Sequence, residues 1–435
     1  MDKKAFGVTS AVMLGIGSMV GAGIFIIIGE AGAIAGNIVW ISFVFGGIAA
    51  MLSGYSLAKL SLRYPSRGGI VEFLVQCYAE GIFSGSLGVL FYISGLIAIA
   101  AVAKSFGVYA ATFMHGYSEF WTNIYAVGIV VLFGIINLIG ASLVAKSENL
   151  IVIIKLTILI TFTIAALFNI NPELLSIKDM PPVKDMLFAI GLTFFAYQGF
   201  SVITNTVEDM YNPSKNMLKA MIIAISLVAV LYILVSFAVL GNLPLNEIIK
   251  TKDYALAEAA KPIFGQYGFK IIAATALLAT ASAINASLYA TTEIGYTMAK
   301  EGNLPNIYEY NIFNSNEGLV ISTILIIPMI IFFNLTEITT VATLVVLIVQ
   351  GFTHIGHLIK IKQTGANVFL IVSSIIAIFA IVGLTLYYTY EHNPHIGYYM
   401  IMAFALAVAV ELGLRMTTHR TIKKQTIDLF NKSTE

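Results

Sequence analysis

The chain has 435 residues, of which 58% are hydrophobic and only 11% are charged, and its formal net charge is +1. Soluble domains carry about 25% charged residues, so this composition excludes a soluble globular protein and predicts one that crosses a membrane several times. The near-neutral charge gives no support for a nucleic acid partner, and the single cysteine, Cys77, excludes an intramolecular disulfide and a multi-cysteine metal site.

Twelve apolar segments follow one another along the chain, and each is about as long as a helix that crosses a bilayer. They lie at about residues 6–32, 37–60, 82–112, 122–142, 149–170, 186–210, 216–241, 268–299, 318–334, 338–360, 367–389 and 396–414. Most of the 24 Lys and Arg residues fall in loops on the same side as the N-terminus. The positive-inside rule therefore predicts a multi-pass protein of the cell membrane (the plasma or inner membrane) with both termini in the cytoplasm.

The first segment carries the run GIGSMVGAGIF at residues 15–25, with four glycines in nine positions. Glycine costs about 1 kcal/mol relative to alanine in a helix, and open backbone in lipid is tolerated only where protein covers it or it lines a cavity. The run is therefore either a close-packing face, for which Gly17 and Gly21 have the small-xxx-small spacing, or a break that binds a ligand.

The sixth segment carries the run FFAYQGFS at residues 194–201, which places a glycine and polar side chains near its middle. Each interruption begins a set of five segments, and an odd number of spans turns the second set upside down relative to the first. Paired interruptions at matching positions of two halves point to the central site of a transporter. The second interruption therefore favours a binding break in the first segment over packing alone.

Four motifs then occur in order at the expected segments: GSMVGAGIF (17–25), PSRGG (65–69), FFAYQGF with EDMYNP (194–200 and 208–213), and KEGNLP (300–305). Together they resemble the amino acid–polyamine–organocation (APC) transporters over about residues 5–360. The resemblance implies an all-α polytopic membrane protein with 12 transmembrane helices, a 5+5 inverted repeat with broken helices 1 and 6, and two accessory C-terminal helices. The parts are then residues 1–170 and 171–362 for the two repeats, 363–415 for the accessory helices and 416–435 for a cytoplasmic tail. It also implies alternating access, with an amino acid moved together with a proton or by exchange.

The resemblance assigns the two charged groups of the substrate to the backbone of the two interrupted helices. Free N–H groups at the start of a half-helix suit a carboxylate, and here they would be the amides of Ala22, Gly23 and Ile24. Exposed carbonyls would meet the ammonium, and they belong to Met19 and Val20 in the first helix and to Phe195, Ala196 and Gln198 in the sixth.

Phe195 also matches a family aromatic that shields the bound substrate as a gate, and a packed or lipid-facing phenylalanine is the alternative. Gln198 departs from the aliphatic residue that the family often has there, and it contacts either the substrate or a neighbouring helix. No Asp or Glu falls between residues 15 and 29 or between 188 and 207, where a dication would need a carboxylate partner. We therefore expect a neutral, zwitterionic amino acid with a small to medium side chain.

Lys155 is the only unambiguous charge inside a predicted span, and an ionisable residue at such depth is a functional candidate. It lies about seven residues, or about 10 Å, from the cytoplasmic end of its helix, so a side chain that snorkels to the interface is the alternative. In a proton-coupled subset of the APC family, a lysine of the fifth helix looks to occupy the place of the sodium ion of related transporters. Its amine would then bond the carbonyl of Gly17 and the hydroxyl of Ser282, and would release its proton when the cavity opens inwards.

These features predict secondary active transport of neutral amino acids with broad specificity, by proton symport. An obligate exchanger or a sodium-coupled symporter is the alternative; a channel or a membrane enzyme fits less well, because the spans carry no filter loop and no paired carboxylates. His354 and His357 share a helix face without a third ligand nearby, so we expect no metal and no cofactor. The expected partners are the amino acid, the proton and the lipid bilayer, and the sequence carries no signal for an oligomeric state.

Overall fold

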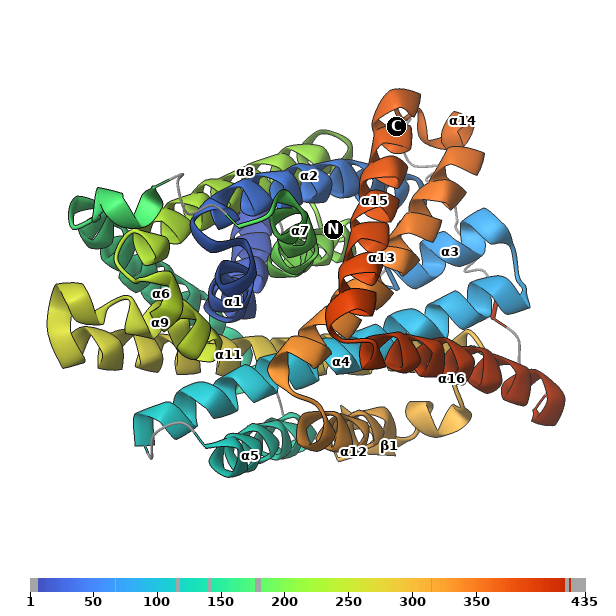
Figure 1. The fold of residues 1–435 in the computed structure, drawn as a ribbon. Coiled ribbons are helices and arrows are strands. Elements are labelled where there is room, and N and C mark those ends of the chain that lie inside the picture. The colour runs from blue at the N-terminus through green and yellow to red at the C-terminus, as the bar shows by residue number, and fades with distance from the viewer. Residues whose placement is uncertain are drawn as a thin grey trace.

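The computed structural model describes residues 7–66, 68–114, 118–139, 142–176, 181–313, 315–418 and 422–423 (Figure 1). For Ala22 and residues 142–149 it describes the backbone only. Nearly all of the described residues are helical, and the only strands among them, β1 (Asn311–Ile312) and β2 (Ser315–Asn316), form a short antiparallel pair.

The helices follow the apolar segments of the sequence closely. The first group is α1 (Val8–Ala35), η1 (Gly36–Ile38), α2 (Val39–Arg63), α3 (Ile70–Tyr78), α4 (Ile82–Met114), α5 (Glu119–Ile139), α6 (Ser142–Phe168) and η2 (Pro172–Leu175). The second is α7 (Val183–Tyr197), η4 (Gln198–Thr206), α8 (Pro213–Leu240), α9 (Leu245–Lys250), η5 (Lys252–Tyr254), α10 (Ala255–Glu258), α11 (Lys261–Lys300) and η6 (Asn306–Glu309). The last is α12 (Glu317–Phe332), α13 (Leu335–Ile359), α14 (Ile361–Thr364), α15 (Val368–His392) and α16 (His395–Thr417).

Ten helical stretches in the described part of the chain are long and apolar enough to cross a membrane. One of them, Gly23–Arg63, runs from the second half of α1 through η1 into α2, and two shorter apolar helices are Val8–Gly21 and α12. All twelve apolar segments of the sequence thus fall on helices. The chain is an all-helical, multi-pass membrane protein.

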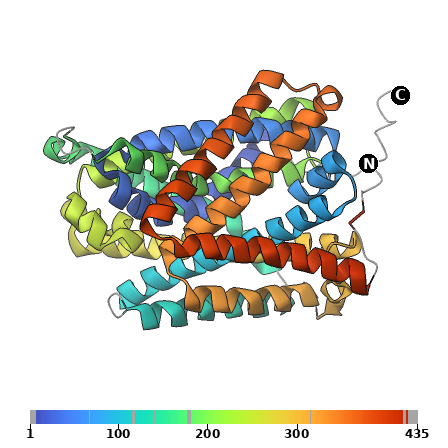
Figure 2. The same cartoon turned by 45° about the vertical axis from the view of Figure 1, so that its right-hand side comes forward.

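The helix α1 lies in the middle of the molecule, where it packs against α7, η4 and α8. A second group of helices is organised around α4, which packs against α5, α11, α13 and α16. In Figures 1 and 2, α5 and α12 lie together at an edge of the molecule, away from α2 and α8. Other helices therefore enclose α1, whereas α5 and α12 are peripheral.

The outer surface is apolar along the peripheral helices. Large hydrophobic side chains are exposed on α5, α6, α8 and α15, among them Leu132, Ile135, Ile153, Ile160, Leu227, Val230 and Ile376. Exposed apolar surface of this extent marks a face that meets lipid or a partner, as a multi-pass membrane protein requires.

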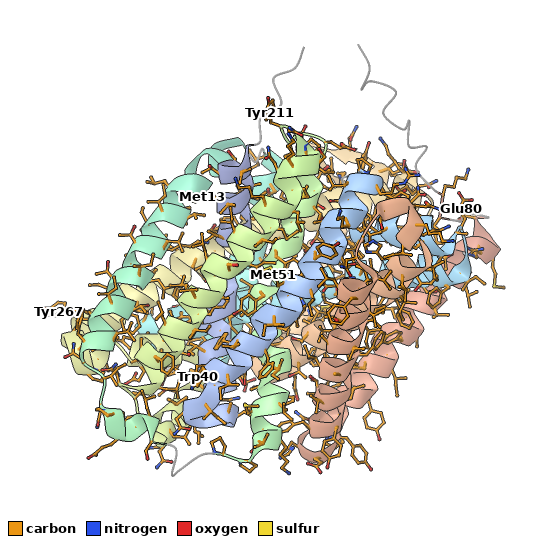
Figure 3. All side chains as sticks on the ribbon, turned by 90° about the horizontal axis from the view of Figure 1, so that it is seen from above. Met13, Trp40, Met51, Glu80, Tyr211 and Tyr267 are labelled. Carbon is orange, nitrogen blue, oxygen red and sulfur yellow. The ribbon has the colours of Figure 1, made fainter. Side chains whose placement is uncertain are left out.

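Two groups of short helices lie at opposite ends of the molecule. Figure 3 labels Tyr211 and Glu80 toward one end and Trp40 toward the other, and we name the ends after Tyr211 and Trp40. At the Trp40 end, α9, η5 and α10 pack on α1, and a Cβ atom on Gly29 would overlap the carbonyl group of Lys252. At the Tyr211 end, α3 packs against α4 and α13. The sequence analysis assigned no helix to either stretch, because each is too short to span a membrane and its buried face is defined only by packing.

Candidate functional site

The two stretches singled out in the sequence cross each other at the centre of the molecule. A Cβ atom on Gly23 of α1 would lie 2.5 Å from the carbonyl oxygen of Ala196, and one on Gly199 of η4 would lie 2.6 Å from the backbone nitrogen of Met19. Only glycine allows the backbones to approach this closely. We call this contact between residues 17–25 and 195–199 the crossing.

At the crossing the sixth segment changes its helix type. The α-helix α7 ends at Tyr197, and Gln198 begins the 3-10 helix η4, which runs to Thr206. The backbone N–H of Gln198 donates to the carbonyl of Phe195, as expected for the tighter 3-10 turn. The change therefore falls within the glycine-containing polar run of the sequence.

The first segment, by contrast, is not broken in this structure. Residues Val8–Ala35 form one α-helix, and in an α-helix every N–H beyond the first turn donates to the carbonyl four residues earlier. The amides of Ala22, Gly23 and Ile24 therefore have partners inside α1 and are not free to bind a carboxylate. The expectation of a broken first helix is wrong for this conformation, because glycine permits a break without imposing one.

Three glycines of α1 instead lie against three neighbouring elements. Built Cβ atoms on Gly15, Gly17 and Gly21 would approach Ile203 of η4, Val152 of α6 and Ala283 of α11, at 2.5, 2.9 and 3.1 Å. Small residues let membrane helices pack closely. Close packing, one of the two interpretations of this run, thus describes what the glycines do here.

Three carbonyl groups in the same part of α1 also accept hydrogen bonds from other helices. Lys155 Nζ on α6 donates to Gly17 O at 2.9 Å, Tyr232 Oη on α8 to Met19 O at 2.7 Å, and Tyr109 Oη on α4 to Phe25 O at 3.0 Å. Side-chain donors that reach helix carbonyls compete with the i→i−4 ladder and favour bending. These three bonds join the glycine-rich part of α1 to α6, α8 and α4.

The carbonyls expected to meet the ammonium group are partly engaged. The Tyr232 hydroxyl lies 2.7 Å from Met19 O and also 3.1 Å from Ala196 O, so it bridges α1 and α7. Val20 of α1 is fully buried beside them. The sequence analysis missed Tyr232, although a tyrosine inside an apolar segment, far from the interfaces where tyrosine gathers, is a detectable signal.

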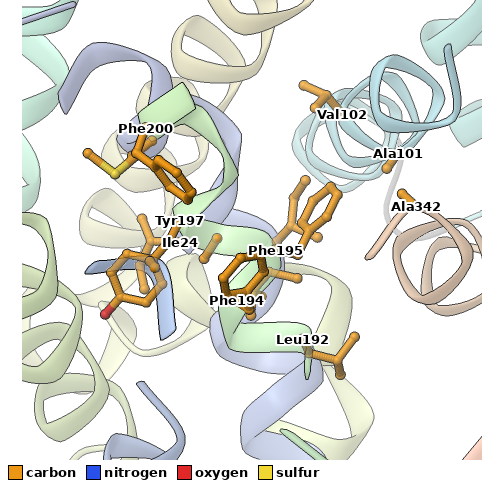
Figure 4. Packing of buried hydrophobic residues seen from close by; sticks show 14 of the residues in the cluster. Ile24, Ala101, Val102, Leu192, Phe194, Phe195, Tyr197, Phe200 and Ala342 are labelled. Carbon is orange, nitrogen blue, oxygen red and sulfur yellow. The ribbon is translucent and has the colours of Figure 1, made fainter. Parts of the chain in front are cut away.

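The Phe195 side chain is 7% exposed and projects from α7 toward α4 and α13 (Figure 4). Val102 and Ala101 of α4 and Ala342 of α13 lie across from it in that view. Phe195 therefore packs in the hydrophobic core between α7, α4 and α13 and does not face lipid.

Gln198 contacts a neighbouring helix. Its Oε1 atom accepts a hydrogen bond from Gln350 Nε2 on α13 at 3.5 Å, whereas its own Nε2 atom is buried and has no partner among the described residues. The helix-to-helix contact expected as one alternative is thus present, and it uses only one end of the amide.

Lys155 is 1% exposed, and its amine points inward to Gly17. A snorkelling lysine would place its amine at the membrane interface, so that alternative does not describe this structure. Ser282 is also buried, on α11, and the neighbouring Gly21 of α1 packs against both α11 and the lysine, since its built Cβ would lie 3.7 Å from Lys155 Nζ. Lys155 thus joins α6 to the glycine-rich part of α1.

Lys155 is not the only buried charge among the described helices. Glu30 of α1, Lys104 of α4 and Glu411 of α16 are each at most 4% exposed. Glu30 accepts hydrogen bonds from Lys252 at 3.2 Å and from Thr336 at 2.8 Å, and Arg415 pairs with Glu411 at 2.6 Å. These groups lie near helix ends in the sequence, where exposure was expected, and distant segments cover them.

Comparison with known proteins is consistent with this architecture. A family model described as amino acid permease matches residues 6–410 of the chain. The chain belongs to the amino acid permeases of the APC superfamily. Membership of this family makes the permease a transporter of amino acids and not an enzyme.

Three relatives illustrate the range of the family. The permease is 35% identical over 425 residues to the uncharacterized protein MJ0609 of Methanocaldococcus jannaschii. This alignment covers 97% of the chain and 98% of that relative. It is 37% identical over 348 residues to the inner membrane transport protein YbaT of Escherichia coli, covering 79% of the chain and 81% of YbaT. It is 27% identical over 309 residues to the serine/threonine exchanger SteT of Bacillus subtilis, covering 70% of each chain.

Proposed function

We propose that the permease carries neutral amino acids across the cell membrane together with protons, by alternating access around the crossing of α1 and α7. The Lys155–Gly17 hydrogen bond carries this proposal, because it connects a buried ionisable group to the backbone that would bind the substrate. The amine would be the group that takes up and releases the proton.

The coupling follows from the strength of that bond. A hydrogen bond from a charged amine is roughly twice as strong as one between neutral groups. Protonated Lys155 therefore ties α6 to α1 firmly, and loss of the proton loosens the tie. Ser282 on α11 would share the amine, so that proton release frees α1 from both neighbours.

The substrate would bind when α1 opens at its glycines. The amides of Ala22, Gly23 and Ile24 would then become free for the carboxylate, and the carbonyls of residues 19–20 and 195–198 would meet the ammonium. Tyr232 would occupy only one lone pair of the Met19 and Ala196 carbonyl oxygens, so the other lone pair could accept from the ammonium. Phe195 would close over the bound amino acid as a gate, since its side chain lies beside the crossing and points toward α4 and α13.

We propose a topology of two five-helix repeats and two accessory helices. The five spans of the first repeat (residues 1–170) would be α1, α2, α4, α5 and α6, and those of the second (171–362) would be α7 with η4, α8, α11, α12 and α13. The helices α15 and α16 would be accessory, and the Tyr211 end would lie in the cytoplasm with both termini. Support comes from the excess of Lys and Arg in the loops assigned to that side.

Uptake into proteoliposomes with and without an inward proton gradient tests the proposal. Wild-type uptake of a labelled neutral amino acid should rise with the gradient, whereas Lys155→Ala should lose this rise and keep some gradient-independent transport. Lys155→Arg should lose it too, because a guanidinium keeps its proton. Lys184→Ala, which alters an exposed ion pair with Glu391, is the matched control and should behave as wild type.

Full gradient-dependent uptake by Lys155→Ala would remove Lys155 from the coupling mechanism. Exchange is the second candidate, because SteT is named an exchanger. An exchanger would need amino acid inside the vesicles, so uptake into empty vesicles under a proton gradient favours symport. Sodium coupling is disfavoured by the amine at Gly17, and replacing sodium with choline should leave uptake unchanged.

A further inference from the structure

The amide nitrogen of Gln198 is a buried hydrogen-bond donor without a protein acceptor. The Nε2 atom has no partner among the described residues, although Oε1 of the same side chain is bonded to Gln350. A buried donor that stays unpaired is destabilising, so its retention calls for an explanation such as a missing ligand. The two N–H bonds of this amide are therefore available to an acceptor from outside the protein.

A chain of hydrogen bonds fixes which end of the amide is free. Ser53 Oγ on α2 lies 3.0 Å from Gln350 Oε1 and 2.9 Å from His354 Nε2. A carbonyl oxygen only accepts, so the one hydroxyl proton of Ser53 goes to Gln350, and His354 donates to Ser53. The bonds then run in one direction, from His354 through Ser53 and Gln350 to Oε1 of Gln198.

The position of the amide places it beside the proposed binding centre. Gln198 follows Phe195 by three residues, and residues at this spacing share a helix face. The Phe195 side chain points from α7 toward α4 and α13, with Ala342 of α13 across from it (Figure 4). Gln350 is eight residues after Ala342, on the same stripe of α13. The free amide thus lies one turn from the Phe195 ring on the same side of the crossing.

We propose that Gln198 Nε2 donates a hydrogen bond to an oxygen in the side chain of the transported amino acid. The permease would then prefer amino acids with a hydroxyl or ether oxygen near Cα over apolar amino acids of the same shape. The proposal rests on the proposed function, because the backbone of the crossing must first bind the ammonium and carboxylate. Gln350, Ser53 and His354 are positioning residues, which hold the amide in this orientation.

Two amino acids of matched shape test this preference. O-Methylserine and norvaline differ by one ether oxygen in place of a methylene group, and the ether oxygen accepts hydrogen bonds without donating. An apolar pocket favours norvaline, whereas a donor aimed at the oxygen favours O-methylserine. We expect O-methylserine to inhibit uptake of a labelled neutral amino acid by wild type with an affinity on the order of tenfold higher than norvaline.

Three variants test whether the Gln198 amide causes the preference for O-methylserine. Gln198→Leu keeps the approximate volume and removes the donor, so the ratio of the two affinities should fall to about one. Gln350→Leu should lower the ratio without removing norvaline binding, because Gln198 is then free to rotate. Gln363→Leu alters a glutamine of α14 that accepts a hydrogen bond from Tyr64, and it should leave the ratio unchanged.

The outcomes separate this proposal from the proposed function. Absence of amino acid uptake by wild type would overturn both. Uptake with norvaline equal to or better than O-methylserine would overturn the proposal alone, as would an unchanged ratio in Gln198→Leu; either result would mean that water satisfies the amide. A hydroxyl can donate a hydrogen bond and an ether oxygen cannot. Preference for threonine over valine without preference for O-methylserine would therefore show that the site accepts a hydrogen bond from the substrate, and would also overturn the proposal. If Gln198→Leu shows no uptake, the affinity ratio of O-methylserine to norvaline is compared between wild type and Gln350→Leu. A lower ratio in Gln350→Leu supports the proposal, and an unchanged ratio overturns it.

Discussion

The helix α1 and the helices around α4 are stabilised in different ways. At the crossing, glycines bring backbone against backbone, and side chains from α4, α6 and α8 bond the carbonyls of α1. Around α4, polar side chains join neighbouring helices: Lys104 bonds Asn123 of α5 at 2.6 Å and the carbonyl of Ile330 of α12 at 2.9 Å. Tyr92 of α4 likewise bonds Ser322 of α12 at 2.7 Å.

This difference indicates which part moves. The small residues of the crossing allow α1 to tilt or shift against its neighbours once its three bonds to Tyr109, Lys155 and Tyr232 are released. Polar bonds such as those of Lys104 fix helices at one relative position, because breaking them in an apolar environment is costly. We infer that α1 and α7 move in transport, while α4, α5 and α12 form the frame against which they move.

The largest expected effect comes from filling the crossing. Gly23→Val should abolish transport and lower the thermal stability in detergent, because its Cβ would lie 2.5 Å from the Ala196 carbonyl oxygen and the backbone cannot yield. Overpacking of this kind costs about 1–3 kcal/mol or more. Uptake and the unfolding midpoint of the purified protein measure both.

Gly128→Ala in α5 is the control, since no atom lies within 4 Å of a Cβ built there. It should keep wild-type uptake and gain slightly in stability from the higher helix propensity of alanine. Wild-type uptake by Gly23→Val would show that close backbone contact is not required at the crossing.

The ion pair at the Trp40 end should be the next most sensitive. Lys252→Met leaves the buried Glu30 without its cation and should destabilise the protein by about 2 kcal/mol, more than Glu30→Gln, which keeps a polar partner for Thr336. Lys184→Met removes an exposed pair and should change stability by less than about 0.5 kcal/mol. Equal losses for the two lysine variants would show that burial of Glu30 is not the deciding factor.

Removing one tyrosine hydroxyl at the crossing and one at α4 allows a direct comparison of the two regions. Tyr232→Phe and Tyr92→Phe each remove one buried hydroxyl, so each should cost about 1 kcal/mol of stability. Only Tyr232→Phe should also weaken substrate affinity, because its hydroxyl orients the carbonyls of Met19 and Ala196. Binding measured by competition, beside thermal unfolding, separates the two effects. A similar loss of affinity in both variants would contradict a special role for Tyr232.

The smallest expected effect concerns Cys77 of α3, a helix that packs against α4. Burial raises the pKa of its thiol to about 12. The reactive thiolate is then a fraction on the order of 10⁻⁵ of the thiol at pH 7.4. A maleimide should label the folded protein very slowly and the denatured protein quickly, with no loss of uptake in the folded state. Rapid labelling of the folded protein would show that α3 opens readily and does not stay packed against α4.

The positions of the helices were predictable, because each span must satisfy its own backbone in lipid and so leaves a long apolar run in the sequence. The inward direction of Lys155 toward Gly17 was also expected, on the strength of a family resemblance. The continuity of α1 was not, since glycine allows both the helix and the break. The partner of Glu30 was not predictable either: Lys252 lies 222 residues away. Nor was the role of Gln350, whose importance depends on the neighbouring Gln198.

Proton movement driven by the amino acid tests the central claim most directly. Proteoliposomes loaded with a pH-sensitive dye, with no gradient imposed, should acidify inside when a neutral amino acid is added outside the wild-type protein. Lys155→Ala vesicles should take up labelled amino acid without acidifying. Acidification by Lys155→Ala at the wild-type ratio of protons to amino acid, or none by wild type during net uptake, would contradict the account.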